Sequence, residues 1–265
     1  MRKTGAASKL STGAKDRQKF DPKARTEKEA IEQVVMANRV LANEGIFDYL
    51  GHVSARNPGN ENTFFISRSC APEMVRKQDI LEVDLEGNVL TKTTGSPYRE
   101  QIIHGAIYRA RPDVHAVLHA HPLEIITFSV LDIPVRPITG FSCQFCEEIP
   151  VYDEYDFTSP AATGMLVTTV EEGARLAKCL GQGKAMLMRG HGVNVVAPTI
   201  PELVQRVVTL KDNVHVQLAA HQLGTPKYIT YDEAKKTRSG FSGIGVERGW
   251  NYWVMRAKKA YPDLE

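Results

Sequence analysis

The stretch Val114-His115-Ala116-Val117-Leu118-His119-Ala120-His121 is a short apolar run that ends in two histidines separated by one residue. Side chains on a β-strand alternate between its two faces, so His119 and His121 point the same way. A third histidine, His191, lies between two glycines directly after another apolar run. Three imidazoles with one coordination position left open are typical of a catalytic metal site rather than a closed structural one. The sequence therefore predicts a metal site formed by these three histidines.

Other folds that carry a His-x-His pair fit the surrounding residues poorly. A cupin would continue the strand beyond the second histidine, but Pro122 follows His121 directly and ends the strand. An amidohydrolase barrel would follow the pair with repeating β/α units, which this chain lacks. The pair is therefore interpreted as one part of a site that His191 completes.

A carboxylate precedes the histidine pair on a predicted helix. Glu100 and His104 are four residues apart, so they lie on one face of that helix. Glu100 is a candidate to bind the metal or to move a proton beside it. The alternative, with equal weight, is that its negative charge only stabilises the start of the helix. His104 has Ile103, Ala106 and Ile107 around it, which is typical of a core histidine.

Two further histidines receive different interpretations. His115 lies at the entry of the histidine strand, about 20 Å from His121 at roughly 3.3 Å per residue, and is predicted to be structural. His52 lies in Gly51-His52-Val53-Ser54-Ala55-Arg56-Asn57-Pro58, a glycine-led stretch that also carries serine and arginine. Such a turn between a helix and a strand is a candidate anion-binding site.

The composition is that of a soluble globular protein. Of 265 residues, 42% are hydrophobic and 24% are charged, and no apolar stretch approaches the roughly 20 residues that span a bilayer. A chain of this length fits one large α/β domain. We therefore expect no membrane segment, and a single domain over residues 26–265 that includes a C-terminal helical extension.

Positive charge is concentrated at the N-terminus. Residues 1–25 carry a net charge of +6, which leaves −4 for the remainder because the total is +2. The composition of this basic segment predicts a disordered tail without the apolar stretch of a secretory signal. The slightly acidic remainder argues against nucleic acid as a ligand. Four cysteines in a chain without such a signal predict free thiols and a cytoplasmic location.

The hydrophobic pattern predicts helices and strands without a regular βαβ repeat. A capping box at Thr26 and Glu29 begins a helix that ends at Asn43-Glu44-Gly45. Further helices are predicted over residues 97–110, 123–131, 169–180 and 199–223, with an amphipathic segment over 250–261. Strands are predicted over 63–66, 80–84, 88–91, 114–121, 185–188 and 193–196. This order favours a largely antiparallel sheet flanked by helices.

Taken together, the motifs resemble the class II aldolase/adducin superfamily from about Glu29 to Gly224. The matching motifs are Gly51-His52-Val53-Ser54, Glu100-Gln101-Ile102-Ile103-His104, Arg111-Pro112-Asp113, His119-Ala120-His121 and Gly190-His191-Gly192. The resemblance implies a three-layer α/β/α fold with a largely antiparallel central sheet. It also implies a homotetramer with active sites at subunit interfaces.

The same resemblance assigns roles to individual residues. His119, His121 and His191 would hold a divalent metal, zinc or manganese in most members, and cobalt also accepts imidazole ligands. Glu100 would alternate between metal ligand and proton carrier. Tyr152 or Tyr155 lies where aldolases of the family present a tyrosine from the adjacent subunit.

The chain departs from the sugar-phosphate aldolases of this superfamily where they hold the phosphate. Those enzymes use a Gly-Asn-x-Ser turn, a Thr-Gly turn and a Ser-Ser pair. Here the corresponding residues are His52, Ser69-Cys70, Tyr98 and Arg99, with Arg68 beside the second turn. Arginine suits carboxylate recognition, and a tyrosine ring stacks on other rings. This pattern resembles the decarboxylase branch, which acts on hydroxylated aromatic or heteroaromatic carboxylates.

The resemblance therefore implies a carbon–carbon lyase of aromatic compound catabolism. A small-molecule carboxylate would lose CO2 through an enolate that the metal stabilises, and Glu100 would donate the proton. Arg68 or Arg99 would bind a second carboxylate of the substrate, with Ser69 and Tyr98 nearby. His52 would assist in orienting the substrate. An aldolase, epimerase or dehydratase acting on a small hydroxy-keto or sugar substrate remains an alternative. A non-catalytic adducin-like scaffold is a distant one.

Overall fold

The computed structural model describes residues 20–93, 95–155, 157–158, 164–238 and 244–262. The predicted basic tail over residues 1–25 falls mostly on residues 1–19, which lie outside the described residues. The first helix, α1 (Glu27–Asn43), begins with the predicted capping box, in which Thr26 accepts a hydrogen bond from the Glu29 amide. It ends where the Asn-Glu-Gly sequence predicts.

A seven-stranded sheet forms the middle layer, in the order β3-β2-β1-β4-β7-β6-β5. Its strands are β1 (His52–Arg56), β2 (Thr63–Ser67), β3 (Ile80–Asp84), β4 (Ala116–Ala120), β5 (Val151–Tyr152), β6 (Ala185–Met188) and β7 (Gly192–Ala197). Neighbouring strands are antiparallel except for the β5–β6 pair, which is parallel. β4 therefore lies at the centre of the sheet, between β1 and β7.

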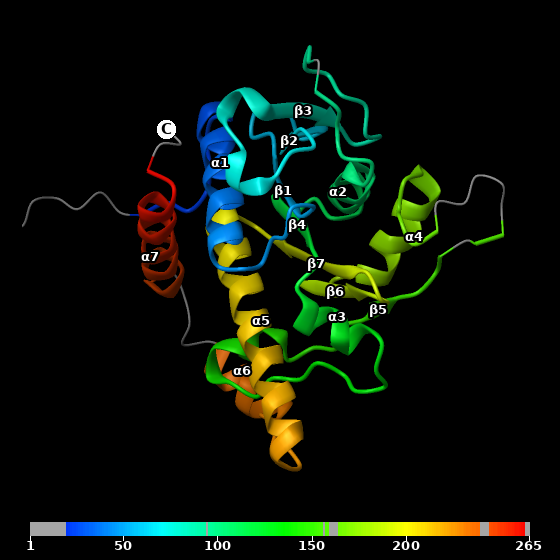
Figure 1. Ribbon diagram of the computed structural model, residues 1–265, viewed down its shortest axis with the longest axis vertical. Helices are drawn as coiled ribbons and strands as arrows, with labels where there is room; N and C mark the ends of the chain where they lie inside the picture. The colour runs from blue at the N-terminus through cyan, green and yellow to red at the C-terminus, as the bar shows by residue number, and fades with distance from the viewer. Residues whose placement is uncertain (1–19, 94, 156, 159–163, 239–243, 263–265) are drawn as a thin grey trace, which may run out of the picture.

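Helices cover both faces of this sheet (Figure 1). One core lies between the sheet and helices α1, α3 (Leu123–Ser129), α5 (Ile200–Leu223) and α7 (Ile244–Ala260). The other core lies between the sheet and helices α2 (Gln101–Ala110) and α4 (Val170–Leu180). Alternate residues of each strand enter opposite cores, as a period of two requires. The predicted three-layer α/β/α fold with a largely antiparallel sheet is therefore confirmed.

Several elements differ from the prediction. Helix α2 begins at Gln101 rather than at residue 97, because Ser69 and Ser96 join two loop segments through a 2.8 Å backbone hydrogen bond. The predicted strand over residues 88–91 amounts to a single bridge between Val83 and Val89. The short strand β5 was not predicted, because two residues give no periodic signal.

The C-terminal helices follow α5. Helix α6 (Tyr231–Arg238) contacts the short 3₁₀ helix η3 (Gly140–Phe145), and α7 packs on α1 and α5. On α7, Trp253 packs against the core while Met255 is exposed.

Across the residues that the structure describes, no helix combines the length and apolarity that a membrane crossing requires. All four cysteines are free thiols.

Candidate metal centre

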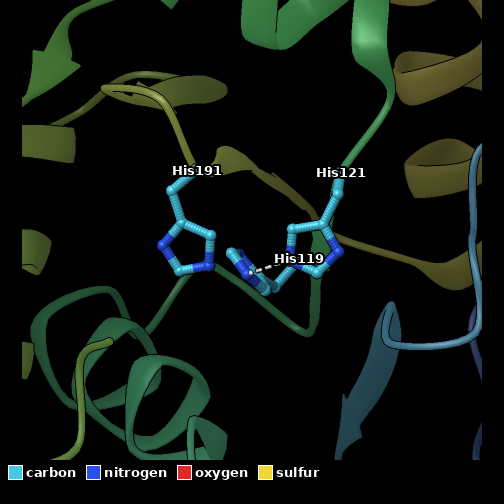
Figure 2. Close-up of side chains that lie close together, drawn as sticks. All are labelled: His119, His121 and His191. Carbon is cyan, nitrogen blue, oxygen red and sulfur yellow. Dashed lines mark hydrogen bonds between the residues drawn. The ribbon is translucent and has the colours of Figure 1, made fainter. Parts of the chain in front are cut away.

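The three predicted metal ligands come from the centre of the sheet and from one hairpin turn. His119 lies on β4 and is fully buried, because β4 has a strand on either side and helix α2 above it. His121 follows the end of β4 by one residue, and Pro122 then starts helix α3. His191 lies in the turn between β6 and β7, after Gly190, whose φ of +64° favours glycine. Figure 2 shows the three rings turned toward a common centre.

The spacing of their nitrogens fits a shared ion. One ring nitrogen from each histidine lies within 4.8 Å of the other two. The Nε2 atoms of His119 and His121 are 3.0 Å apart, and the ring centroids of His119 and His191 are 4.9 Å apart. Two nitrogens bound to one tetrahedral zinc ion lie about 3.3 Å apart. The chain therefore brings together the three imidazoles that the sequence predicts as ligands.

Hydrogen bonds behind two of the rings support the same conclusion. Nδ1 of His119 faces Oδ1 of Asn194 at 3.1 Å, and Nδ1 of His121 faces Oδ1 of Asp48 at 3.3 Å. Both oxygens are acceptors, so both Nδ1 atoms carry the ring proton. The two Nε2 lone pairs then face each other, an arrangement that a cation between them stabilises. Nδ1 of His191 is enclosed and unpaired.

The electrostatics of the cluster also suit a metal. Burial lowers the pKa of His119 well below its usual value of 6.5, so its ring is neutral. Neutral imidazole is the form that binds a metal ion, because the lone pair is then free. The residues present therefore fit a divalent metal by the spacing of their nitrogens, by the hydrogen-bond partners of two rings and by the neutral state of His119.

Glu100 lies directly beside the three histidines. Its Oε2 is 3.5 Å from Nε2 of His191 and 3.8 Å from Nε2 of His119, while its Oε1 accepts a 3.0 Å hydrogen bond from the Val167 amide. Although burial raises the pKa of Glu100, its hydrogen bond with His191, the nearby histidines and the Val167 amide together lower it to about 2. Glu100 holds the N-cap position of α2, but its side chain makes no capping hydrogen bond.

A row of polar side chains crosses the sheet at the level of His119. His52 on β1 and Asn194 on β7 are its direct cross-strand neighbours, on the face that α2 covers. His52 is only 2% exposed, and its ring centroid lies 5.2 Å from that of His119. The segment predicted as an anion-binding turn is instead the buried strand β1. It forms a strand because Val53 and Ala55 pack into the core on the opposite face of the sheet.

The remaining histidines behave as structural residues. His104 is fully buried and makes hydrogen bonds to His52 and Ser54, as the prediction of a satisfied core histidine requires. His115 precedes β4 and is not part of the histidine cluster.

The residues predicted to bind substrate lie on two adjoining loops. The Tyr98 hydroxyl donates a 2.8 Å hydrogen bond to the Cys70 carbonyl, and the Tyr98 ring lies 4.5 Å from the ring of His52. Arg68 forms a 2.7 Å ion pair with Asp79 through Nε. Ser69 and Arg99 are exposed on the same two loops.

Several residues around the cluster were not singled out from the sequence. Asp48 lies in an irregular loop with no motif, so no sequence pattern pointed to it. Asn194 had a weak signal, as one polar residue within the apolar strand β7. Of the two tyrosines considered, Tyr152 is buried and donates to the Glu154 carbonyl at 3.1 Å. The hydroxyl of Tyr155 is enclosed and has no hydrogen-bond partner.

With the site described, the chain can be compared with known proteins. The model of the class II aldolase and adducin N-terminal domain matches residues 32–218. This match spans more than half of the chain, so the protein belongs to that family. The three histidines and Glu100 lie within the matched region.

Curated relatives include enzymes named decarboxylases. The decarboxylase tropJ of Talaromyces stipitatus is 26% identical over 83% of this chain and 90% of its own length. A 3,4-dihydroxyphthalate decarboxylase of Arthrobacter keyseri is 29% identical over 88% of this chain and 95% of its own length. These names agree with the resemblance to the decarboxylase branch.

Solved structures show the same fold. The L-fuculose 1-phosphate aldolase of Glaciozyma antarctica superposes with a TM-score of 0.77, at 24% identity over 92% of this chain and 96% of that protein. At this identity the likeness shows the fold alone. Family membership and relatives together support a lyase.

Proposed function

We propose that this protein is a divalent-metal-dependent decarboxylase of a hydroxylated aromatic or heteroaromatic carboxylate. The observation that carries the proposal is the wall formed by Tyr98 and His52 beside His119, with ring centroids 4.5 and 5.2 Å apart. Sugar-phosphate aldolases of the family are expected to place small hydrogen-bond donors there. A wall of two rings suits a planar aromatic substrate better than a phosphate. The relatives named decarboxylases support the same class of reaction.

His119, His121 and His191 would hold the metal, with Asn194 and Asp48 fixing the orientation of the first two rings. A bound divalent ion supplies a Lewis acid for the negative charge that develops on oxygen when a carbon–carbon bond breaks. Zinc and manganese are the expected ions, and cobalt also suits imidazole ligands.

Glu100 would deliver the proton that replaces the lost carboxylate. Its carboxylate faces the histidine cluster and is largely screened from bulk water. Because Glu100 is ionised in the free protein, Oε2 would first accept the proton of the substrate's ring hydroxyl and then donate it to the carbon that loses the carboxylate. The Val167 amide holds the other oxygen, Oε1, and so fixes the direction in which Oε2 points.

Arg68 and Arg99 are the proposed partners of a second substrate carboxylate. Among the described residues, only Nε of Arg68 is engaged, by Asp79, so its two terminal amino groups remain available for a bidentate contact. Arg99 is exposed on the adjoining loop. Ser69 and Tyr98 would complete this end of the substrate-binding site, and His52 would orient the substrate.

We further propose a homotetramer with active sites at subunit interfaces. Large apolar side chains close to the site residues in sequence are exposed, including Tyr49, Leu50, Leu123, Val130 and Leu131. Such side chains are typical of surfaces that another subunit covers.

We also propose one domain over residues 26–265, preceded by a basic tail. Four free thiols favour a cytoplasmic location.

The test is a direct product assay. Metal-loaded protein is incubated with 3,4-dihydroxyphthalate and with 2,3-dihydroxybenzoate, and released CO2 is measured against Glu100→Gln as the matched control. In parallel, hydroxy-keto sugar phosphates are tested for release of aldehyde. We expect CO2 from an aromatic acid and no aldehyde. Aldehyde release without CO2 from any acid would replace this proposal with an aldolase.

A further inference from the structure

A buried chain of hydrogen bonds runs from the metal centre into the core between the sheet and α2. His52 Nδ1 lies 2.7 Å from His104 Nε2, and His104 Nδ1 lies 2.6 Å from Ser54 Oγ. Ser54 Oγ lies 2.8 Å from the Tyr108 hydroxyl. All four side chains are at most 2% exposed. The four side chains face one another because His52 and Ser54 are two residues apart on β1, and His104 and Tyr108 are four residues apart on α2.

The rings of His52 and His104 share one hydrogen, because the 2.7 Å contact joins one nitrogen of each ring and one of the two must be the acceptor. Burial lowers the pKa of His104 to about 3, and His52 is buried beside other histidines. Each ring therefore carries one N–H and one lone pair. The hydrogen between the two rings belongs either to His104 Nε2 or to His52 Nδ1. This choice fixes which nitrogen of His52 keeps a hydrogen at the other end of the ring.

A count of hydroxyl hydrogens separates the two arrangements. The Tyr108 oxygen also accepts a hydrogen bond from the Val117 amide, so among the described residues Ser54 is the acceptor available to the Tyr108 hydrogen. If Tyr108 donates to Ser54, Ser54 donates to His104, and His104 donates to His52, then every hydrogen between these four side chains has an acceptor. The hydrogen left without one is then on Nε2 of His52, an atom that is not among those sealed from solvent. If His104 donates to Ser54 instead, either the Ser54 or the Tyr108 hydrogen is left without one. A buried donor without an acceptor is unfavourable, so the first arrangement is preferred.

The first arrangement leaves His52 with its hydrogen on Nε2. Nε2 of His52 has no hydrogen-bond partner among the described residues. It is also absent from the unpaired polar atoms that are fully enclosed, so it remains open to solvent or to a ligand. The ring of His52 lies between Tyr98 and His119, so Nε2 is an open donor at the edge of the metal centre.

We propose that Tyr108, Ser54 and His104 hold His52 as a neutral Nε2–H donor for an anionic oxygen of a substrate bound at the metal centre. The inference deepens the proposed function and rests on it for the identity of the ligand, a carboxylate or phenolate. His104 and Ser54 are positioning residues, because they act through His52. In this state His52 donates a hydrogen bond and does not serve as a base, which leaves proton delivery to Glu100.

The hydrogen arrangement is testable without any activity. Neutron diffraction from deuterium-exchanged crystals of the full chain locates the hydrogens on both rings. We expect deuterium on Nε2 of His52 and on Nε2 of His104, and none on Nδ1 of His52. Deuterium on Nδ1 of His52, or on both of its nitrogens, would overturn the inference. This result is independent of whether any aromatic acid is decarboxylated.

Two substitutions at one position test the positioning role. His104→Gln keeps an N–H that can donate to His52, whereas His104→Leu removes it. We expect the KM for 3,4-dihydroxyphthalate to rise about tenfold in the leucine variant and to stay within about threefold in the glutamine variant. Thermal unfolding confirms that both variants fold. An equal KM in both variants would refute the role of His104. If the wild-type protein neither binds nor converts this acid, the proposed function fails, and the neutron map still decides the inference.

Discussion

At the scale of single residues, two of the candidate ligands use their ring nitrogens for separate tasks. Nδ1 of His119 and Nδ1 of His121 face the oxygens of Asn194 and Asp48, and both Nε2 atoms face the centre of the cluster. The side-chain oxygens behind the rings thus fix which nitrogen carries the lone pair. Glu100 adds a carboxylate whose Oε2 faces the Nε2 atoms of His119 and His191.

We expect Glu100→Gln to separate catalysis from metal binding. The amide keeps the size of the side chain but cannot transfer a proton, so kcat should fall by about 10²- to 10⁴-fold. The bound metal should remain, because the three imidazoles are unchanged. Steady-state kinetics together with elemental analysis of the same preparation check both halves. An unchanged kcat would remove Glu100 from the mechanism.

Asn194→Ala should weaken metal binding although it leaves all three metal-binding histidines unchanged. The substitution removes the acceptor at 3.1 Å that orients His119, and such losses lower metal affinity by about 10- to 100-fold. Asn194→Asp is the matched control, since it keeps an acceptor oxygen at the same position. Competition with a fluorescent zinc chelator measures both variants. Equal affinity of Asn194→Ala and the wild-type protein would contradict this role.

At the scale of elements, the site depends on how closely the β6–β7 hairpin approaches the end of β4. A Cβ atom added at Gly192 would lie 2.5 Å from the Ala120 carbonyl oxygen and 3.0 Å from Cδ2 of His121. Glycine is therefore needed for the close approach that brings His191 to the histidine pair.

Gly192→Ala should consequently disturb the site through the backbone. We expect the free energy of unfolding to fall by about 1–3 kcal/mol and metal affinity to fall with it, because the hairpin must move away from β4. Gly140→Ala is the control, since no atom lies within 4 Å of its added Cβ. Urea denaturation and metal titration compare the two variants. Full metal affinity in Gly192→Ala would show that the hairpin tolerates the shift.

The sequence predicts those parts of the site whose signals are local. The histidine pair follows from a period of two on an apolar strand, and His191 stands out through its flanking glycines. Asp48 was missed, because its role depends on a loop that only the tertiary fold brings to His121. Helix α2 was predicted four residues too long at its start, because contacts between Ser69 and Ser96 hold that segment outside the helix.

At the scale of the whole molecule, the sheet separates an apolar core from one that carries polar chemistry. The face toward α1 and α5 is lined by aliphatic and aromatic side chains. The face toward α2 buries His52, His104 and His119 within the second core. The burial of these histidines in neutral form links the stability of the fold to pH.

Acid should destabilise the metal-free protein in a defined window. The folded-state pKa of His104 is about 3, below its usual 6.5, so the unfolded chain binds more protons between these values. Stability is therefore complete above pH 6.5 and is lost as the pH falls toward 3, by about 1.4 kcal/mol per pH unit for each such histidine. Urea denaturation at several pH values measures the slope. His104→Gln should have a smaller slope, and an equal slope would contradict this assignment.

The central claim is that His119, His121 and His191 share one divalent ion. Elemental analysis of the purified full-length protein tests it most directly, before and after incubation with zinc, manganese or cobalt and removal of unbound ions. We expect about one divalent ion per chain in the wild-type protein and a large loss in His191→Ala, with His115→Ala as a folded control that keeps the ion. A wild-type protein that retains no divalent ion under any of these conditions would contradict the account.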